Sequence, residues 1–164
     1  IIDRRLFFEL RDYYRQDSQN RVKLYHLCFK SMKAMPKQEW SYQELFQLYL
    51  EDGKLDEAES VIDKIFVHAT PEWNLLGRKQ NYFYQMKLAE EYAKRGDKKM
   101  VLTLLKKLHQ TSPKHVLTER FYCLYAQNCD DPREAMKWVS EGLKKHPESK
   151  GLLKILDAII DIHY

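Results

Sequence analysis

Apolar residues recur at spacings of three and four along almost the whole chain, which is the pattern of amphipathic helices with one buried face. Residues 38–67 show the plan most clearly, with one apolar helix face before Gly53 and a second one after it. Glycine in the left-handed conformation commonly ends a helix, so Gly53 predicts the turn between two antiparallel helices. The same order of helix, turn and helix recurs around Gly96 and around Asp131-Pro132.

A four-position pattern repeats along the chain at a spacing close to 34 residues. Its members stand at offsets 0, 4, 7 and 12, and its four copies begin at Leu24, Ala58, Val101 and Ala135. Successive starts lie 34, 43 and 34 residues apart, so nine residues are inserted between the second and third copies. A fixed period in this range predicts a solenoid of helix pairs. The predicted units are about 5–37, 38–70, 71–114 and 115–148, followed by a terminal helix at 149–164.

Three of these units share a more specific set of residues. The first set is Tyr42, Leu45, Phe46, Tyr49, Gly53, Ala58, Ile62 and Ile65. The second set is Leu88, Ala89, Tyr92, Gly96, Val101, Leu105, Leu108 and Pro113. The third set is Ala126, Ala135, Val139, Gly142 and Pro147. These sets resemble the tetratricopeptide repeat, in divergent form. The resemblance covers most of residues 5–164 and implies one all-α domain, a right-handed solenoid of about four antiparallel helix pairs plus a C-terminal helix.

Large and small residues exchange places between units. Phe46 stands opposite Ala58 in the second unit, whereas Ala89 stands opposite Val101 in the third. Cores tolerate such exchanges when the total volume is conserved. We therefore expect Ala58 and Ala135 to be buried where the two helices of a pair cross.

The nine-residue insertion predicts a longer first helix in the third unit. Thr70-Pro71 has the form of an N-cap followed by proline at the first helical position. Apolar and aromatic residues follow from Trp73 onward, so we predict a helix of about 25 residues, bent at Gly77. Its start, around Trp73, would be a ledge for a partner or would pack against a flanking domain.

Composition excludes several protein classes. The 164 residues are 44% hydrophobic and 32% charged, with only five glycines and five prolines, which fits a charge-rich helical protein better than an all-β one. No apolar run approaches the roughly 18 residues of a membrane helix. We expect a cytoplasmic protein without a membrane partner, and the start Ile1-Ile2 indicates part of a longer chain.

Catalytic and metal-binding motifs are missing from the sequence. The six histidines are scattered along the chain and none belongs to a metal-like cluster of ligands, and Cys28, Cys123 and Cys129 show no paired spacing. We interpret the cysteines as small apolar filler. The chain is therefore predicted to have no enzymatic activity, no metal and no cofactor.

The resemblance implies that the first helix of each pair lines a concave surface. The partner-binding residues that it places there are Gln43, Gln47, Lys87, Glu90, Lys94, Arg120 and Asn128. Because the later half is basic and rich in amides, it would suit an acidic peptide or a carboxylate. Gln47 and Glu90 occupy slots where chaperone-tail binders of this family have asparagine or a cation, so we do not predict chaperone-tail binding.

The resulting hypothesis is a protein–protein interaction or scaffold module that binds a peptide or partner domain. Two alternatives stay open: a regulatory or sensor domain of a multidomain protein, and an RNA-binding helical-repeat protein. Aromatic and basic residues interleave at Arg120-Phe121-Tyr122 and from Arg78 to Tyr84, as in stacking platforms for single strands, but a net charge of +4 favours a protein over nucleic acid.

The terminal helix carries an apolar stripe through Leu153, Leu156 and Ile160. The ends of a solenoid need a polar outer face, and this helix lacks one. We therefore expect either self-association through the C-terminal helix or a neighbour that covers it.

Overall fold

The computed structural model describes residues 2–163, and these form helices, turns and loops without a strand. The α-helices are α1 (Arg4–Arg15), α2 (Arg21–Ala34), α3 (Glu39–Glu51), α4 (Leu55–Lys64), α5 (Leu75–Lys94), α6 (Lys98–Thr111), α7 (Glu119–Asn128), α8 (Pro132–Lys145) and α9 (Lys150–His163). Three short segments complete the set: η1 (Ser18–Asn20), η2 (Ile65–Ala69) and η3 (Lys114–Val116). The predicted all-α fold class is confirmed for this part of the chain.

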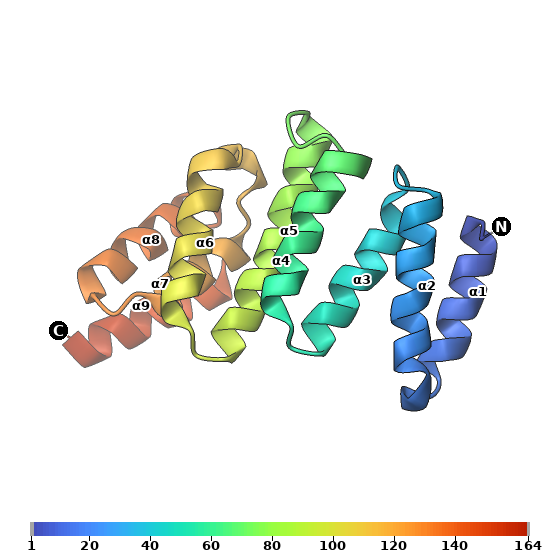
Figure 1. Cartoon of the computed structure of the whole chain (residues 1–164). Coiled ribbons are helices and arrows are strands. Elements are labelled where there is room, and N and C mark those ends of the chain that lie inside the picture. The colour runs from blue at the N-terminus through green and yellow to red at the C-terminus, as the bar shows by residue number, and fades with distance from the viewer. Residues whose placement is uncertain (1, 164) are drawn as a thin grey trace. The chain divides into compact units, whose positions relative to one another are not determined.

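The helices form two compact units, one ending at Gly77 and the other beginning at Arg78. In unit 1, α1 packs on α2, α2 on α3, and α3 on α4. In unit 2, α6 packs on α7, α7 on α8, and α9 on both α7 and α8. Helices that follow one another along the chain are therefore neighbours within a unit, as can be followed in Figure 1. A solenoid that continues through both units stays a prediction.

The turns between paired helices follow the local signals in the sequence. Gly53 and Gly96, just after α3 and α5, have φ angles of 70° and 75°, which glycine adopts without steric cost. Asp131 accepts a hydrogen bond from the backbone N–H of Arg133, and Pro132 occupies the first turn of α8. These three predicted turns are confirmed.

Alanines occupy the helix crossings, as the exchange of large and small residues predicts. Ala58 is fully buried and Ala135 is 4% exposed. Phe46, on α3, is also buried, and so are Ala89 and Val101. The predicted burial of Ala58 and Ala135 is confirmed.

The helix that follows the insertion begins later than predicted. α5 has 20 residues and begins at Leu75, and the side-chain oxygen of Asn74 accepts a hydrogen bond from the backbone N–H of Gly77 at 2.6 Å. The predicted N-cap at Thr70 is wrong, because the preceding helix continues through the π-helical turn η2. The backbone N–H of Thr70 donates to the carbonyl of Ile65 and so ends that turn.

Gly77 has a different role from the predicted bend. It lies in the first turn of α5, where a Cβ atom would be 1.8 Å from the carbonyl oxygen of Pro71. Real Cβ atoms essentially never approach another atom so closely. Glycine at position 77 thus lets the Pro71 turn fold directly against the start of the helix.

Candidate partner-binding surfaces

One face of α5 in unit 2 carries exposed and half-exposed side chains at helical spacing. Phe83, Lys87, Glu90 and Lys94 follow one another at steps of four, three and four residues. Phe83 is 56% exposed, and the ammonium group of Lys87 lies 4.6 Å from its ring centroid. With Arg120 of α7, these residues form what is here named the α5–α7 surface.

Two of the predicted cations on this surface have acidic partners. The Nε of Arg120 donates to Glu90 at 3.0 Å, which joins α7 to α5. The ammonium group of Lys94 donates to Glu91 at 2.8 Å. The α5–α7 surface is therefore less basic than the sequence suggests, because Glu91 also contributes a negative charge.

Asn128 differs from the other residues predicted for this surface, because the structure buries it. It is 8% exposed, and its side-chain amide donates to the backbone carbonyl of Leu124 at 2.7 Å. The side-chain amide thus binds within its own helix, four residues back along the chain, and Asn128 is largely covered by its surroundings.

The two glutamines predicted for unit 1 lie on α3 and differ in their surroundings. Gln43 is exposed. Gln47 is half-buried, and its side-chain amide donates to Glu51 at 3.1 Å. Gln43 therefore meets solvent directly, whereas Gln47 is part of a larger network of charges.

That network, which sequence reasoning missed, joins α1 and the start of α2 to α3. Arg15 donates to Glu44 at 2.7 Å and to Glu51 at 3.1 Å. Arg21 donates to Glu51 at 2.8 Å and to Asp52 at 2.9 Å. Glu44 is only 8% exposed, so its charge depends on the arginine beside it. Each carboxylate of the network is paired with an arginine. The network therefore holds the helices together and is not a candidate binding site.

The pKa values of the acidic members show how strongly the network favours their charged forms. Burial raises the pKa of Glu51, but hydrogen bonds from Arg21 and Gln47 and the charge of Arg15 outweigh it and lower the pKa below its usual 4.5. Burial also raises the pKa of Asp52, and hydrogen bonds from Arg21 and Tyr25 lower it below 3.8. The network therefore stabilises unit 1 most when both groups are ionised.

The predicted ledge around Trp73 is an exposed apolar segment of unit 1. Trp73 is 78% exposed, and Val67, Leu75 and Leu76 are exposed by 74%, 56% and 63%. They belong to the η2 turn, the loop after it and the first turn of α5. The exposure of Trp73 suits a docking role, and that role stays a prediction.

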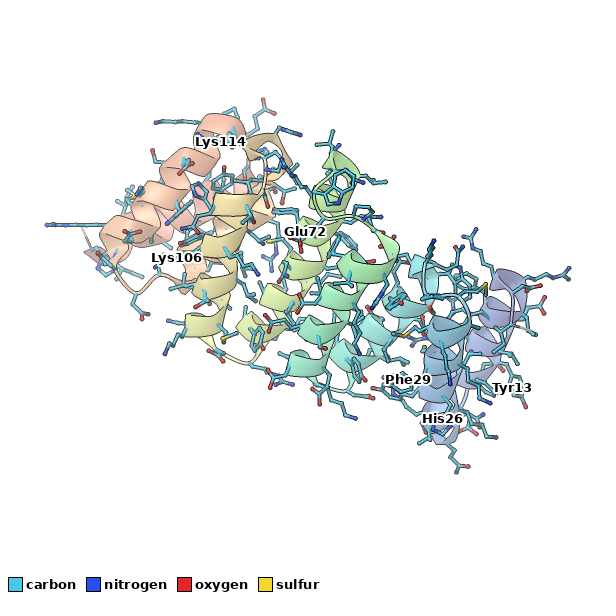
Figure 2. The ribbon with its side chains drawn as sticks, turned by 45° about the horizontal axis from the view of Figure 1, so that its top comes forward. Tyr13, His26, Phe29, Glu72, Lys106 and Lys114 are labelled. Carbon is cyan, nitrogen blue, oxygen red and sulfur yellow. The ribbon has the colours of Figure 1, made fainter. Side chains whose placement is uncertain are left out.

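The aromatic residues that an RNA platform would use in unit 2 are mostly buried. Phe121 and Tyr122 are fully buried, so the Arg120-Phe121-Tyr122 segment offers no ring for a base to stack on. In unit 1, by contrast, Tyr13 and Phe29 are exposed by 63% and 45%, and Figure 2 labels both. In the segment from Arg78 to Tyr84, Tyr82 and Tyr84 are buried as well, whereas Phe83 is 56% exposed. The first of the two segments that suggested RNA binding is therefore part of the core, and the second presents the ring of Phe83 to solvent.

The cysteines have the environment of packing residues. Cys28 and Cys123 are buried, Cys129 is half-buried, and all three are free thiols. Burial raises the pKa of Cys28 to about 12, so its thiolate form is scarce at neutral pH. Within residues 2–163, no group of three or more histidine, cysteine or acidic residues is placed to hold a metal ion. None of the helices in that range combines the length and apolar character needed to cross a bilayer.

No model of a known protein family, no curated protein and no solved structure matches the chain. The tetratricopeptide resemblance thus rests on the sequence pattern alone.

Proposed function

We propose that this chain is a protein-binding module and that its α5–α7 surface holds an extended acidic segment of another protein. The observation that supports this function most is the arrangement of Lys87, Lys94 and Arg120. Lys87 and Lys94 lie along one face of α5, and Arg120 lies on α7 beside it. The Arg120–Glu90 hydrogen bond joins the two helices. An extended ligand would meet all three in succession.

The ion pairs on this surface do not block such a ligand. Exposed ion pairs contribute only about 0–1 kcal/mol, because water and salt screen them. Arg120 is 55% exposed at its side chain, and guanidinium has five N–H donors, so a ligand carboxylate can bind beside Glu90 or replace it. Lys87 has no carboxylate partner among the described residues and is the cation most readily used.

Phe83 adds an apolar contact at one end of the row. Its ring is already covered in part by the Lys87 ammonium group, so a partner side chain would pack against both. The repeat pattern predicts that Gln43 and Gln47 of α3 line the corresponding face of unit 1. We therefore expect an acidic ligand with at least one apolar side chain next to its charges.

Selection from a displayed library of random peptides tests this function. The parent chain and a Lys94→Glu/Arg120→Glu variant would be used as separate targets, with a Lys99→Glu/Lys107→Glu variant of α6 as the matched control. Lys99 and Lys107 are exposed and make no side-chain ion pair in the described structure, so the control has the same charge change at another surface.

We expect acidic peptides to be enriched by the parent and by the control but not by the α5–α7 variant. Their binding should weaken as ionic strength rises, because exposed charges are screened. Enrichment of the same peptides by all three targets would place the binding site elsewhere, and the segment around Trp73 would then be examined first.

A further inference from the structure

A groove with an apolar floor and a basic rim runs between α8 and α9 in unit 2. Its volume is about 630 Å³. The floor is formed by Met136, Val139, Leu143 and Leu156. The rim carries Arg133, Lys137 and Lys144, all from α8 and all exposed. These residues are named the α8–α9 groove.

The three rim cations are not neutralised by their surroundings. No side-chain hydrogen bond or ion pair joins Arg133, Lys137 or Lys144 to another residue in the described range. This distinguishes the groove from the α5–α7 surface, where acidic residues pair with two of the cations. The acidic residues nearest along α8, Glu134 and Glu141, lie elsewhere: Glu134 borders a separate pocket with Cys129, and Glu141 is 3.6 Å from His109.

The outer face of α9 is complementary to this groove, because it carries apolar side chains next to acidic ones. Leu153 and Ile160 are each 42% exposed, and Leu156 between them is half-buried. This confirms the predicted exposure of the stripe at its two ends. Asp157 and Asp161, one helical turn apart, are exposed beside these apolar side chains and have no ion pair within the described residues. The same helix therefore presents an apolar ridge with two free carboxylates next to it.

We propose that the α8–α9 groove binds the α9 helix of a second copy of this chain. In this dimer, Leu153 and Ile160 of one protomer would cover the apolar floor of the other. Asp157 and Asp161 would meet the rim cations Arg133, Lys137 and Lys144, arranged in self-complementary fashion about a two-fold axis. Each half of the interface then contains the same contacts, made in opposite directions.

The lengths of the helices fit this arrangement. α8 and α9 each have 14 residues, so both are about 21 Å long, and the groove lining extends along α8 from Arg133 to Lys144. Dimerisation would then remove the apolar side chains of the ridge and of the floor from water together. This burial of apolar surface is the main favourable contribution to the free energy of association. A partner of different sequence could supply an acidic helix as well, but only a second copy accounts for the basic groove and the acidic ridge being on the same two helices.

Sedimentation of two charge-reversal variants, alone and mixed, tests the proposal. The first variant, Lys137→Glu/Lys144→Glu, makes the rim acidic and keeps the acidic α9. The second, Asp157→Lys/Asp161→Lys, makes α9 basic and keeps the basic rim. In a dimer of either variant alone, like charges face each other at both halves of the interface. In a mixed dimer with one protomer of each variant, opposite charges face each other at both halves.

We expect the parent to dimerise as its concentration rises, and each variant alone to dimerise at least about tenfold more weakly. An equimolar mixture of the two variants should recover dimers of parental strength. Lys99→Glu/Lys107→Glu serves as the control for charge reversal on another surface and should behave as the parent does. Circular dichroism and thermal melting of each variant show whether it keeps the parental fold.

Two results would overturn the proposal. A parent that stays monomeric at the highest concentration reached would mean that the groove receives a different protein or nothing. A folded pair of variants whose mixture fails to recover dimers would mean that rim and ridge do not face each other. Neither result depends on peptide binding at the α5–α7 surface.

Discussion

At the scale of single residues, Gly142 of α8 is closely packed against two neighbouring helices of unit 2. A Cβ atom at this position would lie 2.7 Å from Cβ of Tyr122 and 2.8 Å from Cδ1 of Leu152. Those residues belong to α7 and α9, so the missing side chain lets three helices approach at one point. Interiors packed to this density have little room for even one added methyl group.

Gly142→Ala should therefore destabilise the chain. Alanine favours a helix over glycine by about 1 kcal/mol, but overpacking costs about 1–3 kcal/mol, so we expect a net loss in the free energy of unfolding. Gly151→Ala, at the exposed start of α9, is the matched control, because its nearest neighbour, Cys123 Sγ, is farther away at 3.2 Å. Urea denaturation of both variants measures the difference, and equal stabilities would show that α8 can move away from α7 and α9.

At the scale of helices, the arginine and carboxylate network of unit 1 fixes α1 and the start of α2 against α3. The lowered pKa values of Glu51 and Asp52 mean that the folded chain binds protons at these groups less readily than the unfolded chain does. Stability from this source is fully present above their ordinary pKa values of 4.5 and 3.8, and it is lost as the pH falls through the lower values of the folded state.

Glu51→Gln should make the stability of the chain less dependent on pH in the acid range. The variant should be less stable than the parent at neutral pH, and the difference should shrink as the pH falls below 4.5 and the parental carboxylate takes up a proton. Urea unfolding followed at a series of pH values measures this, with Glu59→Gln on α4 as the control. A difference between Glu51→Gln and the parent that is the same at every pH would show that the charge of Glu51 does not contribute.

Sequence rules predicted the helices well where the signal is local. Gly53, Gly96 and Asp131-Pro132 end or begin helices through their own backbone and side-chain chemistry, so they could be identified without a structure. Thr70-Pro71 has an equally good N-terminal signal, but the preceding helix extends to Ala69 and uses Thr70 as its end. Local rules cannot decide between two helices that compete for one residue.

Side-chain partners across helices were much harder to predict. Arg15 and Glu44 are 29 residues apart, and Arg120 and Glu90 are 30 apart, so their pairing depends on how the helices pack. For the same reason Asn128 was expected on an open surface, although its amide group turns back to the carbonyl of Leu124. The sequence thus indicated Lys87, Glu90, Lys94 and Arg120 of the α5–α7 surface, but neither the pairing of Arg120 with Glu90 nor the contribution of Glu91.

At the scale of the whole molecule, we propose different surfaces for different partners. Lys87, Lys94 and Arg120 would bind an acidic segment of another protein, whereas the α8–α9 groove would bind a second copy. The exposed apolar segment around Trp73 is a third surface, in unit 1. These surfaces are formed by different residues, so one residue-resolved measurement on the intact chain can distinguish them.

The proposed binding of an acidic segment at the α5–α7 surface is tested by NMR mapping of amide chemical shifts, during titration with an acidic peptide selected on the parent chain. We expect the largest shift changes on α5 from Phe83 to Lys94 and on α7 around Arg120. They should be lost in the Lys94→Glu/Arg120→Glu variant and kept in the α6 control. Changes concentrated between Val67 and Leu76, or along α8 and α9, with α7 and the stretch from Phe83 to Lys94 unaffected, would contradict this proposal.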